Sequence, residues 1–421
     1  MSAEPAALSA VVARLADPEI HLAAYGSVAF PLIGIIQAPV LTLLSLSTAM
    51  SKDWDSFQKG RRLMFYLAGV LSALFLLITF TPLYYVLVEN LIGAPPEIVE
   101  PARISMMFAI PWTFAVAYRR FHQGVMIRFE HSRAVTVGTM LRFSADALVI
   151  AIALTVGGVP GSVLATVMMV CGVVTEAVYV GLRVRPVLKY EVRPSPPTSQ
   201  PISLWQMVVF FIPLGLMPLL NQLIRPIGSA ALSRMPNPLD TLAIWPVVSS
   251  LSWLIVTPGS AYNEVVIAML DRPGAKKNLM RFMVILMGVQ FALMVILAVT
   301  PLSHLWFSQV SGLQPELAEL ASRAFLLLVP VGLLSPLNSW YTGVILHSRR
   351  SRSVTEGMGI YLGVYTAALL LGGALLEVSG IYIAIGASVL SALSQNGWLW
   401  YRSREAIRML DREQETQIHE T

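Results

Sequence analysis

The chain has 421 residues, of which 56% are hydrophobic and 13% are charged. An average soluble domain carries about 25% charged residues, so this chain has too few charges to cover a water-soluble surface. The mean hydropathy of +0.68 agrees, and it excludes soluble enzymes, disordered chains and nucleic-acid-binding proteins as leading classes. The formal net charge is +5, and the single cysteine, Cys171, forbids an internal disulfide.

Apolar segments of about the ~20 residues that a membrane-spanning helix needs recur along the whole chain. In chain order the predicted spans are 22–50, 63–88, 104–127, 135–157, 161–182, 203–224, 241–270, 282–303, 320–346, 354–376 and 380–401. Prolines inside these spans predict kinked helices rather than straight rods. These prolines are Pro31, Pro39, Pro111, Pro246, Pro258, Pro330 and Pro336.

Basic residues concentrate in alternate loops between the predicted spans. These loops and the C-terminal tail hold 21 of the 29 lysines and arginines. By the positive-inside rule this side is cytoplasmic, which places the C terminus in the cytoplasm and, as the sequence stands, the N terminus outside. The pattern predicts a multi-pass protein of the plasma membrane or the bacterial inner membrane. Because topology accounts for the basic excess, we expect no nucleic-acid partner.

The chain matches itself at a shift of 219 positions. The matched positions include Pro39 with Pro258, Thr81-Pro82-Leu83 with Thr300-Pro301-Leu302, Gly93 with Gly312, Pro111 with Pro330, and Gly124 with Gly343. Matched loops carry matched charge, so the two copies are predicted to run in the same direction across the membrane. Parallel repeats of this kind are typical of transporters built from two similar lobes.

The repeat predicts four parts of the chain. They are an N-terminal lobe over 1–183, a cytoplasmic linker over 184–202, a C-terminal lobe over 203–402 and a polar cytoplasmic tail over 403–421. The counterpart of span 203–224 would lie before residue 1, and Ala10–Pro18 resembles Ala230–Pro238. We therefore expect a twelve-helix design that lacks its first helix. A start codon placed too late, a truncation and a genuine eleven-span protein all remain open.

Two bundles of six helices joined by a cytoplasmic linker resemble the MATE-type transporters of the multidrug/oligosaccharidyl-lipid/polysaccharide exporter superfamily. Several short stretches more narrowly resemble the progressive ankylosis protein family. These are Leu22-Ala23-Ala24-Tyr25-Gly26, Arg225-Pro226-Ile227 followed by Ser233-Arg234, Tyr262-Asn263-Glu264-Val265, His122, and Asp146 after Ser144. The resemblance implies an all-α MATE-like fold and transport of an anionic small molecule, since the vertebrate member is tied to efflux of pyrophosphate, ATP and citrate. The missing front helix departs from the family pattern.

Ionisable residues inside the predicted spans are candidates for a transport site, because a charge near a helix centre costs about 2.5–3.5 kcal/mol on insertion scales. Arg142 and Asp146 stand four residues apart on one helix face. They either form a structural ion pair or lie in a cavity. The other substrate-binding candidates are Arg119, Arg120, His122, Glu176, Asn221, Arg225 and Glu264.

Two of these assignments have plainer alternatives. Arg119 and Arg120 could extend to the lipid headgroups, and His122 could be a hydrogen-bonded packing residue. Uncharged polar residues within the spans are expected to form hydrogen bonds between helices. These are Gln37, Asn221, Gln222, Asn263, Asn338, Gln395 and Asn396.

The charges do not recur in the second copy of the repeat. Arg142 aligns with Tyr361, Asp146 with Tyr365, Glu176 with Gln395, His122 with Tyr341 and Glu264 with Ser45. The two copies share their helices, but the charged side chains within the spans lie mostly in the first copy. This difference predicts that the functional site lies mainly in the N-terminal lobe.

Motifs of enzymes are absent from the sequence: it has no GxxxxGK[ST] phosphate loop, no HExxH and no paired cysteines. We therefore expect no enzyme, no cofactor and no metal site. The sequence predicts a secondary active exporter of a small organic or phosphate-containing anion, such as citrate, pyrophosphate or a nucleotide, that works by alternating access as a monomer. The alternatives are a multidrug cation antiporter and a flippase of a lipid-linked substrate. The candidates for binding a coupling proton or sodium ion are Asp146, Glu176 and Glu264.

Overall fold

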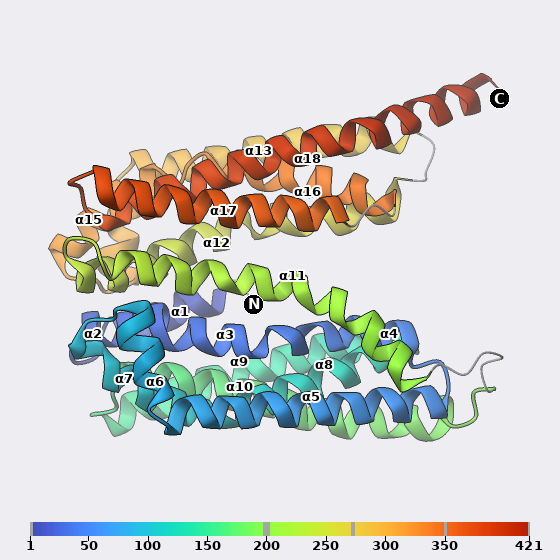
Figure 1. Cartoon of the computed structure of the whole chain (residues 1–421), viewed down its shortest axis with the longest axis horizontal. Helices are drawn as coiled ribbons and strands as arrows, with labels where there is room; N and C mark the ends of the chain where they lie inside the picture. The colour runs from blue at the N-terminus through green and yellow to red at the C-terminus, as the bar shows by residue number, and fades with distance from the viewer. Residues whose placement is uncertain (1–2, 197–202, 271–273, 349–351, 420–421) are drawn as a thin grey trace. The chain divides into compact units, whose positions relative to one another are not determined.

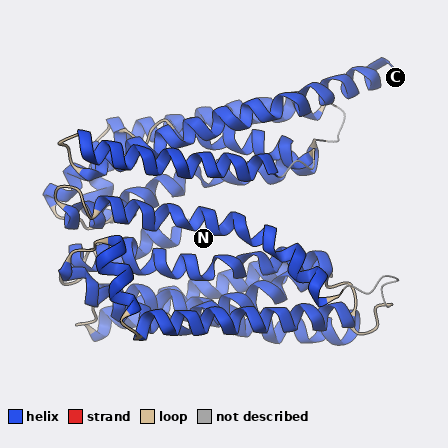
Figure 2. Ribbon diagram, in the orientation of Figure 1, coloured by secondary structure: helices blue, strands red, loops and turns tan. Residues whose placement is uncertain are grey.

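The computed structural model describes residues 3–196, 203–270, 274–348 and 352–419. These residues form helices joined by short connections, and no strand occurs among them (Figure 2). Seven of the described helices are long and apolar enough to cross a membrane, and a bent pair of helices makes an eighth candidate. The chain is an all-α membrane protein, as predicted. The other three predicted spans, 104–127, 203–224 and 380–401, also lie in helices.

Contacts divide the chain into two compact units. The N-terminal unit is Leu15–Ala230, and the C-terminal unit is Met1–Arg14 together with Ala231–Thr421. The division therefore does not fall in the predicted linker over 184–202. The predicted lobe boundaries follow the sequence repeat and remain a prediction.

Apart from the N-terminal helix α1, the helices coloured blue to green in Figure 1 belong to the N-terminal unit. They are α2 (Pro18–Ala23), η1 (Ala24–Ala29), α3 (Phe30–Gln37), η2 (Ala38–Thr42), α4 (Leu43–Met50), α5 (Trp54–Phe80), α6 (Leu83–Tyr85), η3 (Val86–Ile92), α7 (Pro96–Phe108), α8 (Ile110–Arg128), α9 (Ser132–Val156), α10 (Gly161–Val187), η4 (Leu188–Val192) and most of α11 (Leu204–Leu232).

The C-terminal unit repeats this order of elements. Its helices are α12 (Pro238–Met269), α13 (Ala275–Val299), α14 (Leu302–Leu305), η5 (Trp306–Val310), α15 (Pro315–Leu326), α16 (Val331–His347), α17 (Arg352–Leu375) and α18 (Gly380–His419), and the N-terminal helix α1 (Ala3–Val12) belongs to the same unit. From α2 to α10, each main helix has a counterpart about 219 positions later.

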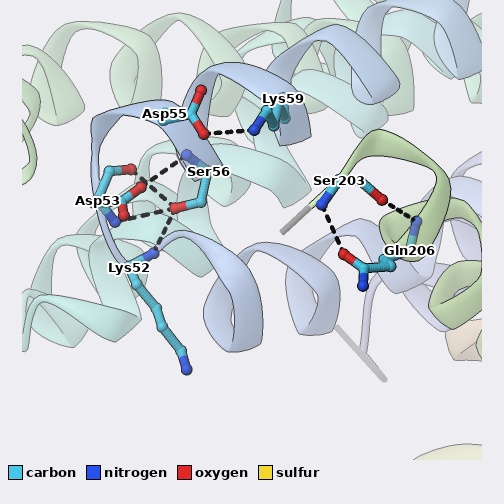
Figure 3. A network of polar contacts seen from close by, with 7 residues as sticks. All are labelled: Lys52, Asp53, Asp55, Ser56, Lys59, Ser203 and Gln206. Atoms are coloured by element: carbon cyan, nitrogen blue, oxygen red, sulfur yellow. Dashed lines mark hydrogen bonds and ion pairs between the residues drawn. The ribbon is translucent and has the colours of Figure 1, made fainter. Parts of the chain in front are cut away.

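Local chemistry explains where two helices of the N-terminal unit begin. At the start of α5 the Asp53 carboxylate accepts a hydrogen bond from the Ser56 backbone N–H at 2.8 Å, and the Asp53 N–H donates to Ser56 Oγ at 3.0 Å (Figure 3). Ser203 and Gln206 exchange the same two kinds of hydrogen bond at the start of α11. Each reciprocal pair satisfies backbone donors that a helix start leaves open.

Prolines mark several of the breaks between helical segments, as predicted. Pro39 lies in the 3-10 turn η2, Pro111 lies in the first turn of α8 after α7 ends, and Pro330 precedes α16 at a bend of 49°. Pro246 and Pro258, in contrast, lie inside α12 without interrupting it.

Paired turns show why the repeat retains particular residue types. Gly93 and its counterpart Gly312 both have positive φ, 74° and 70°, where a Cβ is disfavoured. Asp17 and Asn237 also lie in the left-handed region, with φ of 46° and 50°, and Asp and Asn tolerate that region better than most residues.

Each unit includes a helix from the other half of the repeat. Helix α1 packs on α12 in the C-terminal unit, and Arg14, just after α1, donates to the Val310 carbonyl at 2.7 Å. Helix α11 lies with the N-terminal unit, where Gln222 reaches Gly34 and the Arg225 guanidinium lies 5.3 Å from the Phe30 ring centroid.

Candidate functional site

Two glycines bring helices α9 and α10 of the N-terminal unit close together. A Cβ placed on Gly138 of α9 would lie 3.3 Å from Glu176 Cγ of α10. A Cβ placed on Gly172 of α10 would lie only 2.0 Å from Asp146 Oδ1 of α9. Glycine at these two positions leaves room for carboxylate side chains between the helices.

A buried ion pair joins α8 to α10. Arg119 Nη1 pairs with Glu176 Oε2, and Gln123 Nε2 donates to Glu176 Oε1 at 2.8 Å. Glu176 is 0% exposed and Arg119 is 5% exposed. Both carboxylate oxygens are engaged, which is the condition under which a buried charge is tolerated.

Arg142 and Asp146 are both buried on α9, and both lie against Gly172. Their position on one face of the helix agrees with their spacing of four residues. Arg120 of α8 interacts electrostatically with Arg119, Arg142 and Glu176. Its Nε is buried and has no hydrogen-bond partner in the described part of the chain.

We call these six residues, Arg119, Arg120, Gln123, Arg142, Asp146 and Glu176, the charged cluster. It combines three guanidinium groups with two carboxylates, so it carries a formal excess of one positive charge. In a medium of low dielectric constant this excess attracts anions more strongly than it would in water.

The remaining predicted site residues have other surroundings, each within its own unit. The His122 ring packs beside Tyr118, Phe121 and Phe57, and its Nδ1 donates to the Tyr118 carbonyl at 2.8 Å. This arrangement corresponds to the packing alternative for His122. Glu264 is exposed on α12 of the other unit.

Asn221 and Arg225 belong to α11 of the N-terminal unit, and both are exposed. Extension to the lipid headgroups was the alternative for Arg119 and Arg120, but Arg119 is buried in the pair with Glu176. Arg120 is partly exposed, although its Nε is buried.

Two members of this region were not among the predicted site residues. Gln123 was missed because an uncharged amide is unremarkable on a helix, although its position four residues after Arg119 places it on the same face. Gly172 was missed because only the packing reveals what its missing side chain makes room for. Within the described residues there is no group of three or more His, Cys, Asp or Glu side chains suited to a metal.

No protein-family model and no curated protein sequence matches the chain. Solved structures do match. A multidrug resistance MATE family transporter of the MOP superfamily, in its inward-facing conformation, aligns with a TM-score of 0.78 and 14% identity over 97% of this chain and 96% of that one. This chain has the MATE fold.

Two further solved structures are also similar to this chain. The lipid II flippase MurJ aligns with a TM-score of 0.62 and 12% identity over 96% of this chain and 89% of that one. A MOP superfamily transporter from Pyrococcus furiosus, for which the reverse polarity of the binding pocket suggests a different function, aligns with a TM-score of 0.56 and 13% identity over 96% of each chain. At these identities the similarity concerns the fold alone. The charge of the candidate site therefore has to be taken from the side chains of this chain.

Proposed function

We propose that this protein is a secondary active exporter of a small organic or phosphate-containing anion and that it works by alternating access. The MATE fold supports transport as the activity, since its solved neighbours are transporters. The charged cluster supports an anion as the substrate. The observation that carries this proposal is the excess of guanidinium groups, with Arg120 Nε buried and lacking a hydrogen-bond partner in the described part of the chain.

Arginine suits the proposed substrates for geometric reasons. Its planar guanidinium donates two parallel hydrogen bonds to a carboxylate or a phosphate. Arg119 is committed to Glu176, and we assign Arg120, whose Nε has no hydrogen-bond partner in the described residues, to first contact with the anion. Asp146 and Glu176 are the buried carboxylates that would take up a coupling proton or sodium ion.

The same carboxylates support the second candidate, a multidrug cation antiporter. In that case Asp146 would bind the coupling ion or the cationic substrate. The third candidate, a flippase, is supported by a groove of about 440 Å³ between α8 and α10. Its lining is mostly apolar, as a lipid chain requires, and it includes the basic residue Arg185.

Flux into proteoliposomes distinguishes these candidates. Purified protein is reconstituted, and uptake of labelled citrate, labelled pyrophosphate, a cationic dye and a fluorescent phospholipid is measured under proton and sodium gradients. We expect flux of at least one of the two anions and none of the dye or lipid.

The variant Arg120→Gln tests the assigned residue. Loss of one charge-assisted hydrogen bond is worth about 1.5–3 kcal/mol, so we expect the anion flux at low substrate concentration to fall by about tenfold or more. Arg133→Gln is the matched control, because Arg133 is exposed near the start of α9 in the same unit. Dye transport that Asp146→Asn abolishes, in a protein without anion flux, would reject the proposal in favour of the cation antiporter.

A further inference from the structure

The C-terminal unit contains a cavity of about 330 Å³ that involves helices α12, α16, α17 and α18. Ligand pockets for small molecules begin at about this volume. The described residues that line it include six serines, three asparagines, Gln395, Thr342, Tyr361 and Trp253, and they include no Asp, Glu, Lys, Arg or His. We call this cavity the neutral pocket.

The sequence repeat shows that the neutral pocket is the counterpart of the charged cluster. At the shift of 219, Arg119, Arg120 and Gln123 of α8 fall on Asn338, Ser339 and Thr342 of α16. Arg142 falls on Tyr361, and Glu176 falls on Gln395. All five of these counterparts line the neutral pocket.

The two equivalent places in the fold therefore have different chemistry. In the N-terminal unit the side chains are charged, and Arg119 and Glu176 hold one another across the helices. In the C-terminal unit the side chains at the matching positions are uncharged and surround a cavity.

The hydroxyl groups of the neutral pocket are oriented in a way that leaves acceptors available. Ser260 Oγ donates to the Thr257 carbonyl at 2.8 Å. Ser339 Oγ donates to the Ser260 carbonyl at 3.2 Å. A hydroxyl that has given its hydrogen to the backbone still carries lone pairs, so these serines can accept hydrogen bonds from a ligand.

Two pocket-lining atoms add unused hydrogen-bonding capacity. Asn396 is 5% exposed, and its amide nitrogen donates to the Ala392 carbonyl at 2.8 Å. Its Oδ1 is buried without a hydrogen-bond partner in the described residues, and so is Ser249 Oγ. Buried polar atoms are rarely left unsatisfied, and each such case in a native structure calls for an explanation.

We propose that the neutral pocket binds an uncharged, hydroxyl-rich group of the sugar or polyol class. Such a ligand supplies many O–H donors to the acceptors just described, and Asn and Gln amides match both its donors and its acceptors. Trp253, which is 52% exposed, supplies a flat apolar surface for the C–H face of a sugar ring. A charged ligand would be desolvated here without a counter-charge from the described lining residues. This inference goes beyond the anion proposal, since it concerns a different unit and a different chemistry.

Binding is measured with the full-length protein in lipid nanodiscs, because sugar-based detergents would compete for the site. Maltose, sorbitol, citrate, tetraphenylphosphonium and sodium chloride are titrated separately, with isothermal calorimetry and tryptophan fluorescence as readouts. We expect saturable binding of maltose or sorbitol that neither citrate nor tetraphenylphosphonium displaces.

Two pocket variants and one control localise the binding. Asn338→Leu removes an amide from the pocket, and Thr342→Val removes a hydroxyl with little change of volume. Each loses a hydrogen bond worth about 1 kcal/mol or more, so we expect the dissociation constant to rise about fivefold to tenfold. Asn278→Leu is the matched control, because Asn278 is exposed on α13 of the same unit.

The proposal is overturned if neither maltose nor sorbitol binds saturably, if the pocket variants bind them like the wild type, or if tetraphenylphosphonium, citrate or sodium shows the variant-sensitive binding instead. A thermal melt of each variant shows whether it is folded, and Thr342→Val serves where Asn338→Leu fails to fold. Because these are binding measurements, a failure of anion flux would leave their outcome unaffected.

Discussion

At the scale of single residues, the sequence indicated which charges lie inside the membrane-spanning segments but not which of them pair. The cost of an intramembrane charge indicated Arg142, Asp146, Glu176 and Glu264 as candidates; the first three are buried in the N-terminal unit, whereas Glu264 is exposed in the C-terminal unit. The spacing of four residues also placed Arg142 and Asp146 on one helix face. The pairing of Arg119 with Glu176 could not be predicted, because it joins positions 57 residues apart on two helices.

The buried pair makes a testable prediction about stability. Arg119→Gln leaves the Glu176 carboxylate buried without its ion-pair partner, and removing one partner of such a pair costs about 3–5 kcal/mol. We expect a clear fall in the midpoint of thermal unfolding in detergent, and partial recovery in the double variant Arg119→Gln/Glu176→Gln.

An exposed pair supplies the control for this measurement. Arg323 and Glu319 form an ion pair whose side chains are 70% and 59% exposed, so Arg323→Gln is expected to cost no more than about 1 kcal/mol. Equal melting temperatures for Arg119→Gln and Arg323→Gln would contradict the buried ion pair.

At the scale of elements, the prolines located the main helix breaks, whereas the irregular turns within the helices were not predicted. Pro39 and Pro330 lie at breaks because proline cannot donate the backbone hydrogen bond that a continuing helix needs. The π-helical segment η1 (Ala24–Ala29) contains no proline, so it has no comparable signal.

Matched glycines set the distance between helices in both units. A Cβ on Gly124 of α8 would lie 1.9 Å from Ser47 Oγ and 2.3 Å from the Leu44 carbonyl oxygen of α4. A Cβ on the counterpart Gly343 of α16 would lie 2.6 Å from Val266 Cβ of α12. The repeat retains glycine here because the two helices touch at this point.

These contacts predict the effect of adding one methyl group. Gly124→Ala must push α8 away from backbone atoms of α4, and overpacking of this kind typically costs 1–3 kcal/mol or more. We expect lower yield of folded protein and a lower melting temperature for Gly124→Ala, with a similar but smaller effect for Gly343→Ala.

Gly288 of α13 is the matched control, because nothing lies within 4 Å of a Cβ placed there. Gly288→Ala should stabilise its helix by up to about 1 kcal/mol, since alanine has the higher helix propensity. If Gly124→Ala melts at or above the temperature of Gly288→Ala, the close approach of α8 and α4 is wrong.

At the scale of the whole molecule, the fold class and the order of elements were predictable from the sequence. Hydropathy identifies the membrane-spanning helices, and the repeat indicates each main helix a second time at the matching position. The orientation in the membrane stays a prediction that rests on loop charge. It is tested with single cysteines in a Cys171→Ser background, which contains no other cysteine.

Exposed residues at matched positions make suitable labelling sites. Glu97 and Glu316 lie in the first turns of α7 and α15, and Arg62 and Arg281 lie in α5 and α13; all four are exposed. A membrane-impermeant maleimide should label Glu97→Cys and Glu316→Cys in intact cells, and Arg62→Cys and Arg281→Cys only after the cells are permeabilised. Members of a matched pair labelled from opposite sides would contradict parallel repeats.

The distribution of α1 and α11 between the units predicts what happens when the chain is cut between its two halves. A polypeptide cut within 197–202 yields two fragments, and each fragment contributes a helix to the unit that is built mainly from the other. Neither fragment can complete its own unit alone. We therefore expect two co-expressed halves to fold only together, because each half supplies a helix that the other half needs to complete its unit.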